Sequence, residues 1–580
     1  MRIRKNICFG FVALLAFITF YSVDLKAQDR AGWISIDDRL TYGDISSELK
    51  LKRNISLSGW KGEELYAQAV ICTSDDLDSL EVIAGNLRNR KYMVPSSSVK
   101  AGFVGYVMTD ELNKDKRGAC GARINSEFDS SFVADPINYD TGFKKLDKNT
   151  IQPVWVKINI PSDAAPGKYS GNISFIGKDK VIAVLPFDLT VSSWLLPEKN
   201  DFHLDLWQNP YSVARYYGVV PFSEEHFDLM RPIMKEYADA GGKVITASII
   251  HKPWNAQTYD PFESMVTWLK KADGTWLFDY TVFDKWVEFM MSLGVEKQIN
   301  CYSMVPWALS FQYIDQATNS FRFLDAEPGT PEYEQFWGTM LRSFAAHLKE
   351  KGWFDITMIA MDERPMHHMK AAIEVIKNAD SDFRISFAGN CHEELLDIVD
   401  DYCIPIGTGY PEGSVQRRRN SGKVTTVYTS CAEAWPNTFT FSSPAEAEWI
   451  GWAAAAQGVD GYLRWALNSW TESPFDDSRF RTWAAGDTYL LYPDAVTSIR
   501  FERLKSGITA FRKVAVLRDY FTKTGNKKKL AELDKMLSLF VVPDTDGIVR
   551  IVSDESEDYA SKTVNIAKQF VDMLSLSYHN

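Results

Sequence analysis

Cysteine is scarce in this chain. The 580 residues contain seven cysteines, and no two of them form a CxxC pair. A disulfide framework or a cysteine-ligated zinc site needs a legible cysteine spacing, so neither is indicated. Cys8 lies near the N-terminus. For the other six we expect buried free thiols; these are Cys72, Cys120, Cys301, Cys391, Cys403 and Cys431.

Positive charge is also in short supply. There are 64 Lys and Arg against 76 Asp and Glu, which gives a formal net charge of −12. This balance argues against nucleic acid and anionic membrane surfaces as partners. What is plentiful is aromatic: 18 Trp and 25 Tyr. Aromatic rings stack on the C–H faces of sugars, but Trp also fills protein cores, so this composition only leans towards carbohydrate.

Long apolar runs are missing except at the N-terminus. Arg2, Arg4 and Lys5 precede an apolar stretch, residues 7–23, and the small residue Ala27 follows. This pattern predicts a cleaved secretory signal peptide, and hence a periplasmic or secreted protein. An uncleaved anchor is the alternative, although the apolar stretch is shorter than a full membrane span. We expect no transmembrane segment in the mature chain.

After the N-terminal segment the pattern is one of short strands and turns. Residues 154–160 alternate with period two, residues 161–167 form a turn cluster with two prolines, and 169–176 and 181–191 continue as strands. Such a series predicts a β-sandwich. A plausible boundary follows at 192–201.

From His203 onward, strand and helix patterns alternate. Helical patterns separate eight strand candidates, and such an alternation over roughly 300 residues predicts an α/β fold, a (β/α)8 TIM barrel. The strand candidates are residues 203–207, 243–249, 298–304, 356–361, 384–388, 402–406, 423–428 and 461–465. We therefore expect a signal peptide over 1–27, a β-sandwich over 28–195, a catalytic barrel over 196–515, and a C-terminal helical segment packed on the barrel over 516–580.

The fourth barrel strand ends in two adjacent carboxylates, Asp362 and Glu363. Two acids at the end of a buried strand are costly unless they are paired, solvated or used. The carboxyl ends of the strands are where barrel active sites form. The functional interpretation is a pair of catalytic carboxylates for glycosidic cleavage. The structural alternative is a cap for the next helix, with Pro365 in its first turn and Arg364 as an ion-pair partner.

Adjacency constrains the mechanism. Neighbouring Cα atoms lie about 3.8 Å apart and neighbouring strand side chains diverge, so one strand end is poorly suited to placing carboxylates on opposite faces of a sugar. It can place one acid at the leaving oxygen and the other beside a 2-substituent. That arrangement suits substrate-assisted catalysis, in which a 2-acetamido oxygen is the nucleophile and a carboxylate stabilises the resulting cation.

The segment Met361-Asp-Glu-Arg-Pro365, on such a strand after a β-sandwich, resembles glycoside hydrolase family 123. Supporting stretches are Pro153-Val-Trp-Val-Lys157, Ala165-Pro-Gly-Lys-Tyr169, Gly486-Asp-Thr-Tyr-Leu-Leu-Tyr-Pro493 and Ser498-Ile-Arg-Phe-Glu-Arg-Leu504. The resemblance implies a retaining, exo-acting N-acetyl-β-galactosaminidase that acts on glycans ending in β-linked GalNAc. It assigns Asp362 to the acetamido group and Glu363 to the general acid/base.

Other residues for sugar binding are expected at the ends of the barrel strands. Aromatic side chains there suit the face of a sugar ring, and amides or histidines suit its hydroxyls, although each can equally have a structural role. The predicted set is Trp207, His251, Tyr302, Asn390, Tyr428, Trp465, Asn468 and Trp470, and Asn209, Trp254, Trp307 and His392 also follow strand ends. His251 and His392 lack the spacing of metal ligands, so we predict no catalytic metal and no cofactor.

Two rival functions remain open from the sequence. The first is a barrel glycosidase with a separate carboxylate nucleophile and no need for an acetamido group. The second is a glycan-binding protein of the same architecture without catalytic activity.

Overall fold

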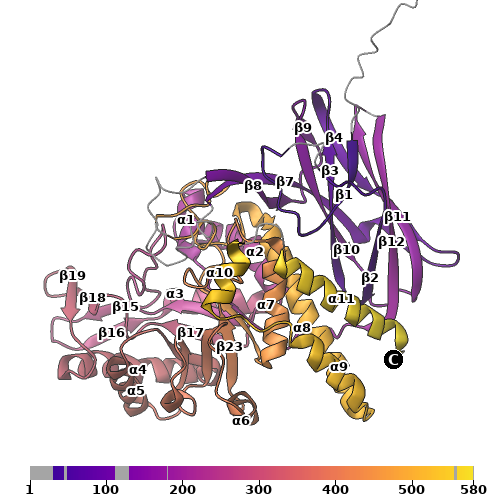
Figure 1. Cartoon of the computed structure of the whole chain (residues 1–580). Coiled ribbons are helices and arrows are strands. Elements are labelled where there is room, and N and C mark those ends of the chain that lie inside the picture. The colour runs from indigo at the N-terminus through magenta and orange to yellow at the C-terminus, as the bar shows by residue number, and fades with distance from the viewer. Residues whose placement is uncertain are drawn as a thin grey trace, which may run out of the picture.

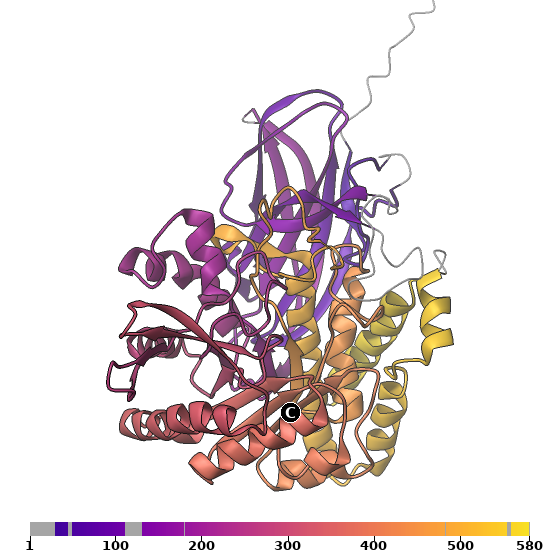
Figure 2. The same ribbon diagram turned by 90° about the vertical axis from the view of Figure 1, so that its left-hand side faces the viewer.

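The computed structural model describes residues 30–578 apart from 45–48, 111–129, 179, 482 and 554–557. The expected signal peptide lies outside the described residues. A β-rich lobe and a larger α/β lobe are joined along the C-terminal helices (Figure 1). Figure 2 shows the β-rich lobe above the α/β lobe, with the C-terminal helices along one side of the latter. Among the described residues, no helix has both the length and the apolar character needed to cross a bilayer.

The N-terminal lobe is a sandwich of two mainly antiparallel sheets, ordered β1-β3-β10-β7-β8 and β2-β12-β11-β4-β9, with the short pair β5 and β6 added to the second sheet. Their interface is the sandwich core, which includes the fully buried Trp33, Val154 and Ile173. The strands are β1 (Arg30–Ile34), β2 (Ile55–Lys61), β3 (Glu64–Cys72), β4 (Leu77–Ala84), β5 (Leu87–Arg88), β6 (Met93–Val94), β7 (Val99–Asp110), β8 (Ser130–Asn138), β9 (Lys144–Leu146), β10 (Ile151–Asn159), β11 (Gly167–Gly177) and β12 (Lys180–Leu195). The predicted sandwich is thus present.

The second lobe contains eight parallel strands in the order β13-β24-β23-β22-β21-β20-β17-β14. A backbone hydrogen bond from Lys243 N to Leu204 O, 2.9 Å, links the two ends of this order, so the barrel is nearly closed. The eight strands are β13 (His203–Leu206), β14 (Val244–Ser248), β17 (Gln298–Tyr302), β20 (Thr357–Asp362), β21 (Arg384–Ala388), β22 (Asp401–Pro405), β23 (Val424–Tyr428) and β24 (Gly461–Arg464). They match the eight predicted strands to within two residues at each end, which confirms the predicted fold class.

Helices cover the outside of the barrel. They are α1 (Pro210–Tyr217), α2 (Glu224–Asp239), α3 (Thr281–Ser292), α4 (Pro331–Lys351), α5 (Met366–Ala379), α6 (Ser414–Asn420), α7 (Pro444–Gln457) and α8 (Ile499–Lys523), with 3₁₀ turns η4 (Phe354–Ile356), η5 (Glu393–Leu395) and η6 (Pro493–Ala495). After β21, where the residue pattern predicts a helix over 393–399, the structure has only the short η5.

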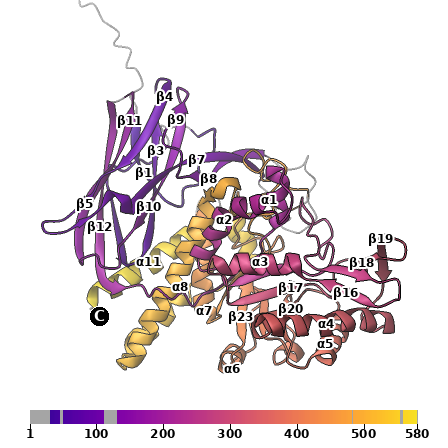
Figure 3. The same cartoon turned by 180° about the vertical axis from the view of Figure 1, so that it is seen from behind.

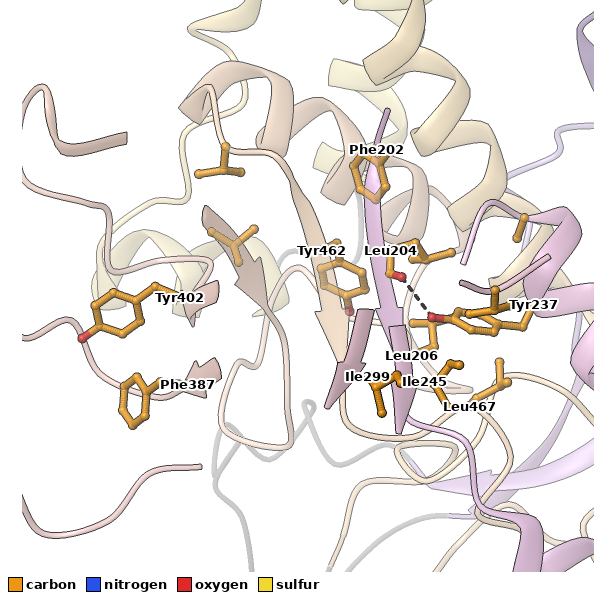
Figure 4. Packing of buried hydrophobic residues seen from close by; sticks show 14 of the residues in the cluster. Phe202, Leu204, Leu206, Tyr237, Ile245, Ile299, Phe387, Tyr402, Tyr462 and Leu467 are labelled. Carbon is orange, nitrogen blue, oxygen red and sulfur yellow. Dashed lines mark hydrogen bonds between the residues drawn. The ribbon is translucent and has the colours of Figure 1, made fainter. Parts of the chain in front are cut away.

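Apolar side chains of the strands pack outward against these helices (Figure 4). Leu204 and Leu206 of β13 are fully buried next to Tyr237 of α2, whose hydroxyl donates to the carbonyl of Leu204 at 3.0 Å. The alternate side chain, Asp205, points into the barrel because successive strand residues face opposite sides. There burial and the neighbouring Asp401 raise the pKa of Asp205 well above its usual range.

A small four-stranded sheet is an addition that the sequence patterns do not predict. It has the order β16-β15-β18-β19 and consists of two hairpins inserted after barrel strands β14 and β17. Its strands are β15 (Thr267–Lys270), β16 (Trp276–Asp279), β18 (Ser310–Asp315) and β19 (Ser320–Asp325). Trp268 of β15 stacks on Phe336 of α4 with ring centroids 4.4 Å apart, so one face of the sheet is part of the core.

Helix α8 connects the barrel to the sandwich. The short strand before it, β25 (Thr497–Ser498), pairs with β8, and buried cations of α8 reach carboxylates of the sandwich. Arg500 binds Asp135 at 2.9 Å, Arg503 binds Asp37 at 2.5 Å and Lys513 binds Glu63 at 2.6 Å. The sandwich and the barrel therefore share one buried interface.

The described part of the C-terminal segment is mainly helical. It contains α9 (Lys527–Leu537), α10 (Thr545–Ser553) and α11 (Tyr559–Ser577). Helix α11 contacts α7 of the barrel and β12 of the sandwich, and the indole N–H of Trp60 donates to Ser575 at 2.8 Å. The expected barrel boundary at residue 515 lies within α8.

We expect Asp135→Ala to destabilise the protein by about 3–5 kcal/mol, because it leaves the buried guanidinium of Arg500 without its counter-ion. Asp135 is 2% exposed and also accepts a hydrogen bond from the hydroxyl of Tyr492 at 2.6 Å. Urea denaturation measures the change. The matched control is Asp519→Ala, because Asp519 lies on α8, the helix that carries Arg500, and pairs with Lys523 at the surface. Surface pairs of this kind contribute about 0–1 kcal/mol. Equal effects of the two substitutions would contradict the importance of the interface pair.

Candidate active site

A cavity of about 400 Å³ lies at the carboxyl ends of the barrel strands and contains both predicted catalytic carboxylates. Six of its fifteen lining residues are aromatic. The lining residues are Trp207, Trp254, Gln257, Trp307, Asp362, Glu363, Ala388, Tyr428, Thr429, Ser430, Cys431, Ala432, Leu463, Trp465 and Trp483. The size suits one or a few sugar units, and the composition is that of a ligand pocket with a few polar groups on an apolar wall.

Asp362 is the last residue of β20, and its carboxylate is held from one side only. The indole N–H of Trp307 donates to Oδ2 at 3.1 Å, and the guanidinium of Arg364 lies 3.7 Å from the same oxygen. The other oxygen, Oδ1, and the indole nitrogen of Trp254 have no hydrogen-bond partner of normal geometry among the described residues. One carboxylate oxygen is thus positioned and the other is available to a ligand.

Burial raises the pKa of Asp362, while Arg364 and the indole N–H groups of Trp307 and Trp254 act in the opposite direction. Arg364 also fixes Trp307, because its guanidinium stacks 3.9 Å above the indole ring and donates to the carbonyl of Val305 at 3.0 Å. These contacts favour an ionised Asp362 in a site that otherwise disfavours charge.

Trp307→Phe is expected to raise the pKa of Asp362 further, since the lost N–H favours the carboxylate form. The acidic limb of kcat/KM should then move to higher pH, because a larger share of Asp362 is protonated at any acidic pH. A hydrogen bond to a charged group contributes about 1.5–3 kcal/mol, so kcat/KM should also fall roughly tenfold or more. A pH–rate profile on a soluble aryl glycoside provides the measurement.

Trp483→Phe is the matched control for this prediction. Trp483 lies on the same wall, but its indole donates to the carbonyl of Gln257 at 3.0 Å. Its acidic limb should stay where it is in the wild type. An unchanged limb in Trp307→Phe would show that the indole does not act on the ionisation of Asp362.

Glu363, directly after the strand, also lines the cavity and is exposed. The amide of Asn390 donates to its Oε1. Gly389 leaves the space for this side chain, since a Cβ at position 389 would lie 3.2 Å from the Cβ of Glu363 and 2.7 Å from the ring of Phe387. Asp362 and Glu363 therefore differ in environment, since Asp362 is partly buried and Glu363 is open to solvent.

Neither carboxylate caps the helix that follows. Helix α5 begins at Met366, its N-cap is Pro365, and no side chain accepts a hydrogen bond there. The capping alternative is wrong, because the N-cap position of α5 is occupied by Pro365 and neither carboxylate accepts a hydrogen bond from the first turn of the helix. Their position in the cavity wall supports the catalytic interpretation.

Three aromatic rings stack at one side of the cavity. The ring of Trp207 lies 4.7 Å from that of Trp254 and 4.6 Å from that of Tyr302. Trp207 and Trp254 line the cavity, whereas Tyr302 is 1% exposed and supports them from behind. Tyr302 therefore packs against the two tryptophans of the wall and is not itself a lining residue.

Tyr428 and Trp465 form further parts of the wall, as predicted from their places at the ends of β23 and β24. Burial, followed by the charge of Glu433, raises the pKa of Tyr428, so its hydroxyl remains a proton donor. The indole of Trp465 donates to Asp487 at 3.3 Å. Burial raises the pKa of Asp487 to about 6, although Arg464 at 2.7 Å opposes this. Sugar contact by these two aromatic residues stays a prediction.

Asn468 and Trp470 lie in the core, not in the cavity, which corrects the prediction made for them. The amide of Asn468 donates to the carbonyl of Asn209 at 2.9 Å and accepts from its backbone N–H. It thereby fixes Asn209, the N-cap of α1. Trp470 is fully buried and donates to the carbonyl of Leu491 at 2.7 Å. The segment after β24 is buried but has no regular secondary structure, so side chains such as those of Asn468 and Trp470 supply hydrogen bonds to buried backbone groups.

His251 and Asn390 lie beside the cavity without lining it. His251 pairs through Nδ1 with Glu263, and Asn390 reaches the cavity only through its hydrogen bond to Glu363. His392 is bound through its backbone N–H to the hydroxyl of Tyr402 at 2.7 Å. Within the described ranges, no three His, Cys, Asp or Glu side chains gather closely enough to hold a metal ion. The absence of a metal and a cofactor stays a prediction.

Several wall residues come from loops that carry no recognisable pattern. Gln257 and Trp483 lie in segments after β14 and β24, and residues 429–432 follow β23. Trp254 and Trp307 follow strand ends, which is the one signal that points to them. Among the cysteines that the structure describes, the expectation of a free thiol fails at one: Cys72, Cys301, Cys391 and Cys403 are free, but Cys431 of the cavity wall is disulfide-bonded. Cys120 lies outside the described residues.

The comparisons with known proteins agree with this geometry. Residues 207–517 match the model of the catalytic domain of glycoside hydrolase 123, and residues 33–176 match that of the glycoside hydrolase 123 N-terminal domain. A family 123 glycoside hydrolase from Clostridium perfringens, described in terms of glycolipid glycan hydrolysis, is 27% identical, with a TM-score of 0.81 over 95% of this chain and 100% of its own. No protein of curated function matches the sequence.

Other solved structures are far less similar. A GH5 xyloglucanase from Bacteroides ovatus is 7% identical over 81% of this chain and 100% of its own, with a TM-score of 0.28. Beta-glucuronidase 2 from Bacteroides uniformis is 11% identical over 75% of this chain and 48% of its own, also with a TM-score of 0.28. Similarity at this level carries no argument about the function of the chain.

The barrel, with two carboxylates in an aromatic cavity at the ends of its strands, is that of a glycoside hydrolase, an enzyme whose substrate is a glycan. More particularly, the chain belongs to glycoside hydrolase family 123. This confirms the family resemblance of the segment around Asp362 and Glu363, and a glycan-binding protein without catalytic activity is not supported.

Proposed function

We propose that the protein is a retaining, exo-acting β-N-acetylgalactosaminidase that removes terminal β-linked GalNAc from glycolipids or oligosaccharides. The observation that carries the proposal is the small number of carboxylate side chains in the wall of the cavity. Among the described residues that line it, the carboxylates are Asp362 and Glu363 alone. The neighbouring acids Glu433 and Asp487 are engaged behind the wall, with Ser430 and Arg464 respectively.

A conventional retaining mechanism needs a nucleophile and an acid/base about 5–5.5 Å apart on opposite faces of the sugar. Two consecutive residues at one strand end are poorly placed for this. A substrate that brings its own nucleophile removes the need. The acetamido oxygen of GalNAc is such a nucleophile, and it leaves the two carboxylates with the separate tasks that their environments suit.

In the first step Glu363, protonated, gives its proton to the glycosidic oxygen as the C1–O bond breaks, and the acetamido oxygen bonds to C1 to form an oxazolinium. Asp362 accepts a hydrogen bond from the acetamido N–H through the oxygen left free by Trp307, and its charge stabilises the cation. In the second step the carboxylate of Glu363 takes a proton from water, which attacks C1 and opens the ring. Two inversions give the β-product.

Three finer points rest on different support. The preference for axial O4 rests on the family resemblance. A glycolipid substrate is supported by the Clostridium perfringens relative. A periplasmic or secreted location is supported by the N-terminal charge and hydropathy pattern and by the disulfide at Cys431, since disulfides persist in oxidising compartments.

A panel of aryl β-glycosides tests the proposal. We expect hydrolysis of the 2-acetamido-2-deoxy galactoside, weaker hydrolysis of its gluco epimer, and almost none of the 2-hydroxyl galactoside. NMR should detect the β-anomer first. A first-formed α-anomer would contradict the substrate-assisted mechanism, and efficient cleavage of the 2-hydroxyl galactoside would favour an enzyme carboxylate as the nucleophile.

A further inference from the structure

One face of the four-stranded sheet β16-β15-β18-β19 is apolar and open to solvent. The strand register places Leu277 opposite Leu269, Leu269 opposite Ile314, and Ile314 opposite Phe321, so that they form a continuous row across all four strands. Phe323, two residues after Phe321, lies on the same side of the edge strand. Phe321, Phe323 and Leu277 are 64%, 55% and 46% exposed. We call these five side chains the apolar sheet face.

Folding of the sheet does not explain this face. The opposite side supplies its packing, through Trp268 on Phe336 at 4.4 Å and Phe311 on Phe336 at 5.4 Å. Polar residues on the outer side would leave those contacts intact. An edge strand with two exposed phenylalanines is moreover prone to aggregation, and native proteins usually avoid such strands. Exposed apolar patches of this kind mark interaction surfaces.

The apolar sheet face lies beside the mouth of the cavity. Both hairpins are inserted at the carboxyl ends of barrel strands, the end at which the cavity opens. The ring of Phe323 is 6.4 Å from that of His251, in the loop after β14. Trp307 lines the cavity, is 51% exposed, and leads directly into β18. Its backbone N–H donates to the carbonyl of Pro253 at 3.0 Å, which joins the two loops.

The location of the sheet leaves its outer face free of the other parts of the chain that the structure describes. In Figures 1 and 3, β18 and β19 lie at the edge of the molecule opposite the sandwich and the C-terminal helices. Two carboxylates flank the row on the same face: Asp279 opposite Thr267 and Asp325 opposite Ser310. These two carboxylates and the net charge of −12 disfavour an anionic surface, so we expect a hydrophobic contact with an uncharged partner.

We propose that the apolar sheet face docks on a neutral lipid surface and so brings the cavity to glycolipid head groups in that surface. The inference rests on the proposed function for its substrate class. A terminal sugar in the cavity stays linked to its lipid, and the lipid surface must then lie close to the cavity mouth. Apolar side chains beside that mouth enter the boundary between head groups and acyl chains.

Phosphatidylcholine vesicles without glycolipid provide the first test. Wild-type protein should sediment with them. The double variant Phe321→Ser/Phe323→Ser should bind on the order of tenfold more weakly or worse, because it loses two aromatic side chains that would be buried in the lipid. Phe143→Ser is the matched control, because Phe143 is 68% exposed but belongs to the sandwich. Leu277→Ser, on the opposite edge strand of the sheet from Phe321, should weaken binding as well and carries the test if the double variant does not fold.

Kinetics provide the second test. The double variant should lose about tenfold in kcat/KM on glycolipid embedded in vesicles, and keep the wild-type kcat/KM on a soluble aryl glycoside. Equal vesicle binding by the double variant and Phe143→Ser would overturn the proposal, as would a wild type that does not bind vesicles. Gel filtration that shows a dimer dissociated by the double variant, with vesicle binding unchanged, would assign the face to a second copy of the chain.

Failure of this proposal can be told apart from failure of the proposed function. Binding to phosphatidylcholine alone needs no sugar, so it tests the lipid contact by itself. Inactivity of the wild type on aryl 2-acetamido-2-deoxy galactosides would contradict the proposed function and leave the vesicle result standing.

Discussion

Asp362→Asn is expected to lower kcat by about 10²–10³-fold and to change KM far less. The amide keeps the size of the side chain and can still accept a hydrogen bond from the acetamido N–H. It has no charge to stabilise the oxazolinium, and that interaction exists only as the cation develops. Steady-state kinetics on an aryl 2-acetamido-2-deoxy galactoside measure both constants.

The position of Asp362 makes this effect specific. Its Oδ2 is held by Trp307 at 3.1 Å, and its Oδ1 makes no hydrogen bond of normal geometry among the described residues, so Oδ1 is the oxygen that can accept one from the substrate. Asp397→Asn is a suitable control, because Asp397 is 80% exposed and lies outside the cavity wall. A change confined to KM in Asp362→Asn would count against its assignment to the transition state.

Glu363→Gln is expected to abolish turnover of substrates with poor leaving groups. General-acid help is worth about 10²–10⁴-fold for such groups and little for an activated aryl group, which leaves without a proton. The variant should therefore show a much steeper dependence of kcat/KM on leaving-group pKa. Opening of the oxazoline also loses its base, and added azide, which needs no deprotonation, should restore turnover of activated substrates.

Glu393→Gln controls for the loss of one exposed carboxylate from the same rim, since Glu393 lies on η5 outside the cavity wall. It should behave as the wild type on every leaving group. Equal and small losses on good and poor leaving groups in Glu363→Gln, with no response to azide, would remove Glu363 from the role of acid/base.

Local pattern was enough to predict the elements of the barrel. Its strands are buried on both faces, so they are short apolar runs bounded by turn residues, and their ends agree with the structure to within two residues. The two catalytic candidates could also be found in the sequence, because two acids at the end of a buried strand are costly unless they are paired, solvated or used. The sequence left helix capping open as an alternative, and only the structure excluded it. The small sheet could not be predicted in this way. Its strands β15, β16, β18 and β19 are only four to six residues long, and their residue pattern does not distinguish them from loops.

For the residues after the strand ends, the local sequence pattern does not predict which side chains line the cavity. Trp470 and Trp465 are both tryptophans after the same strand, yet the first is fully buried and the second lines the cavity. Asn468 resembles a ligand for a hydroxyl but holds Asn209, which is 259 positions away in the chain. The two carboxylates at the end of the fourth strand were set by the sequence itself, since adjacency and strand geometry determine where they point. Which oxygen of Asp362 is free, and which aromatic rings face the sugar, depends on contacts between distant loops, and only the tertiary structure decides those.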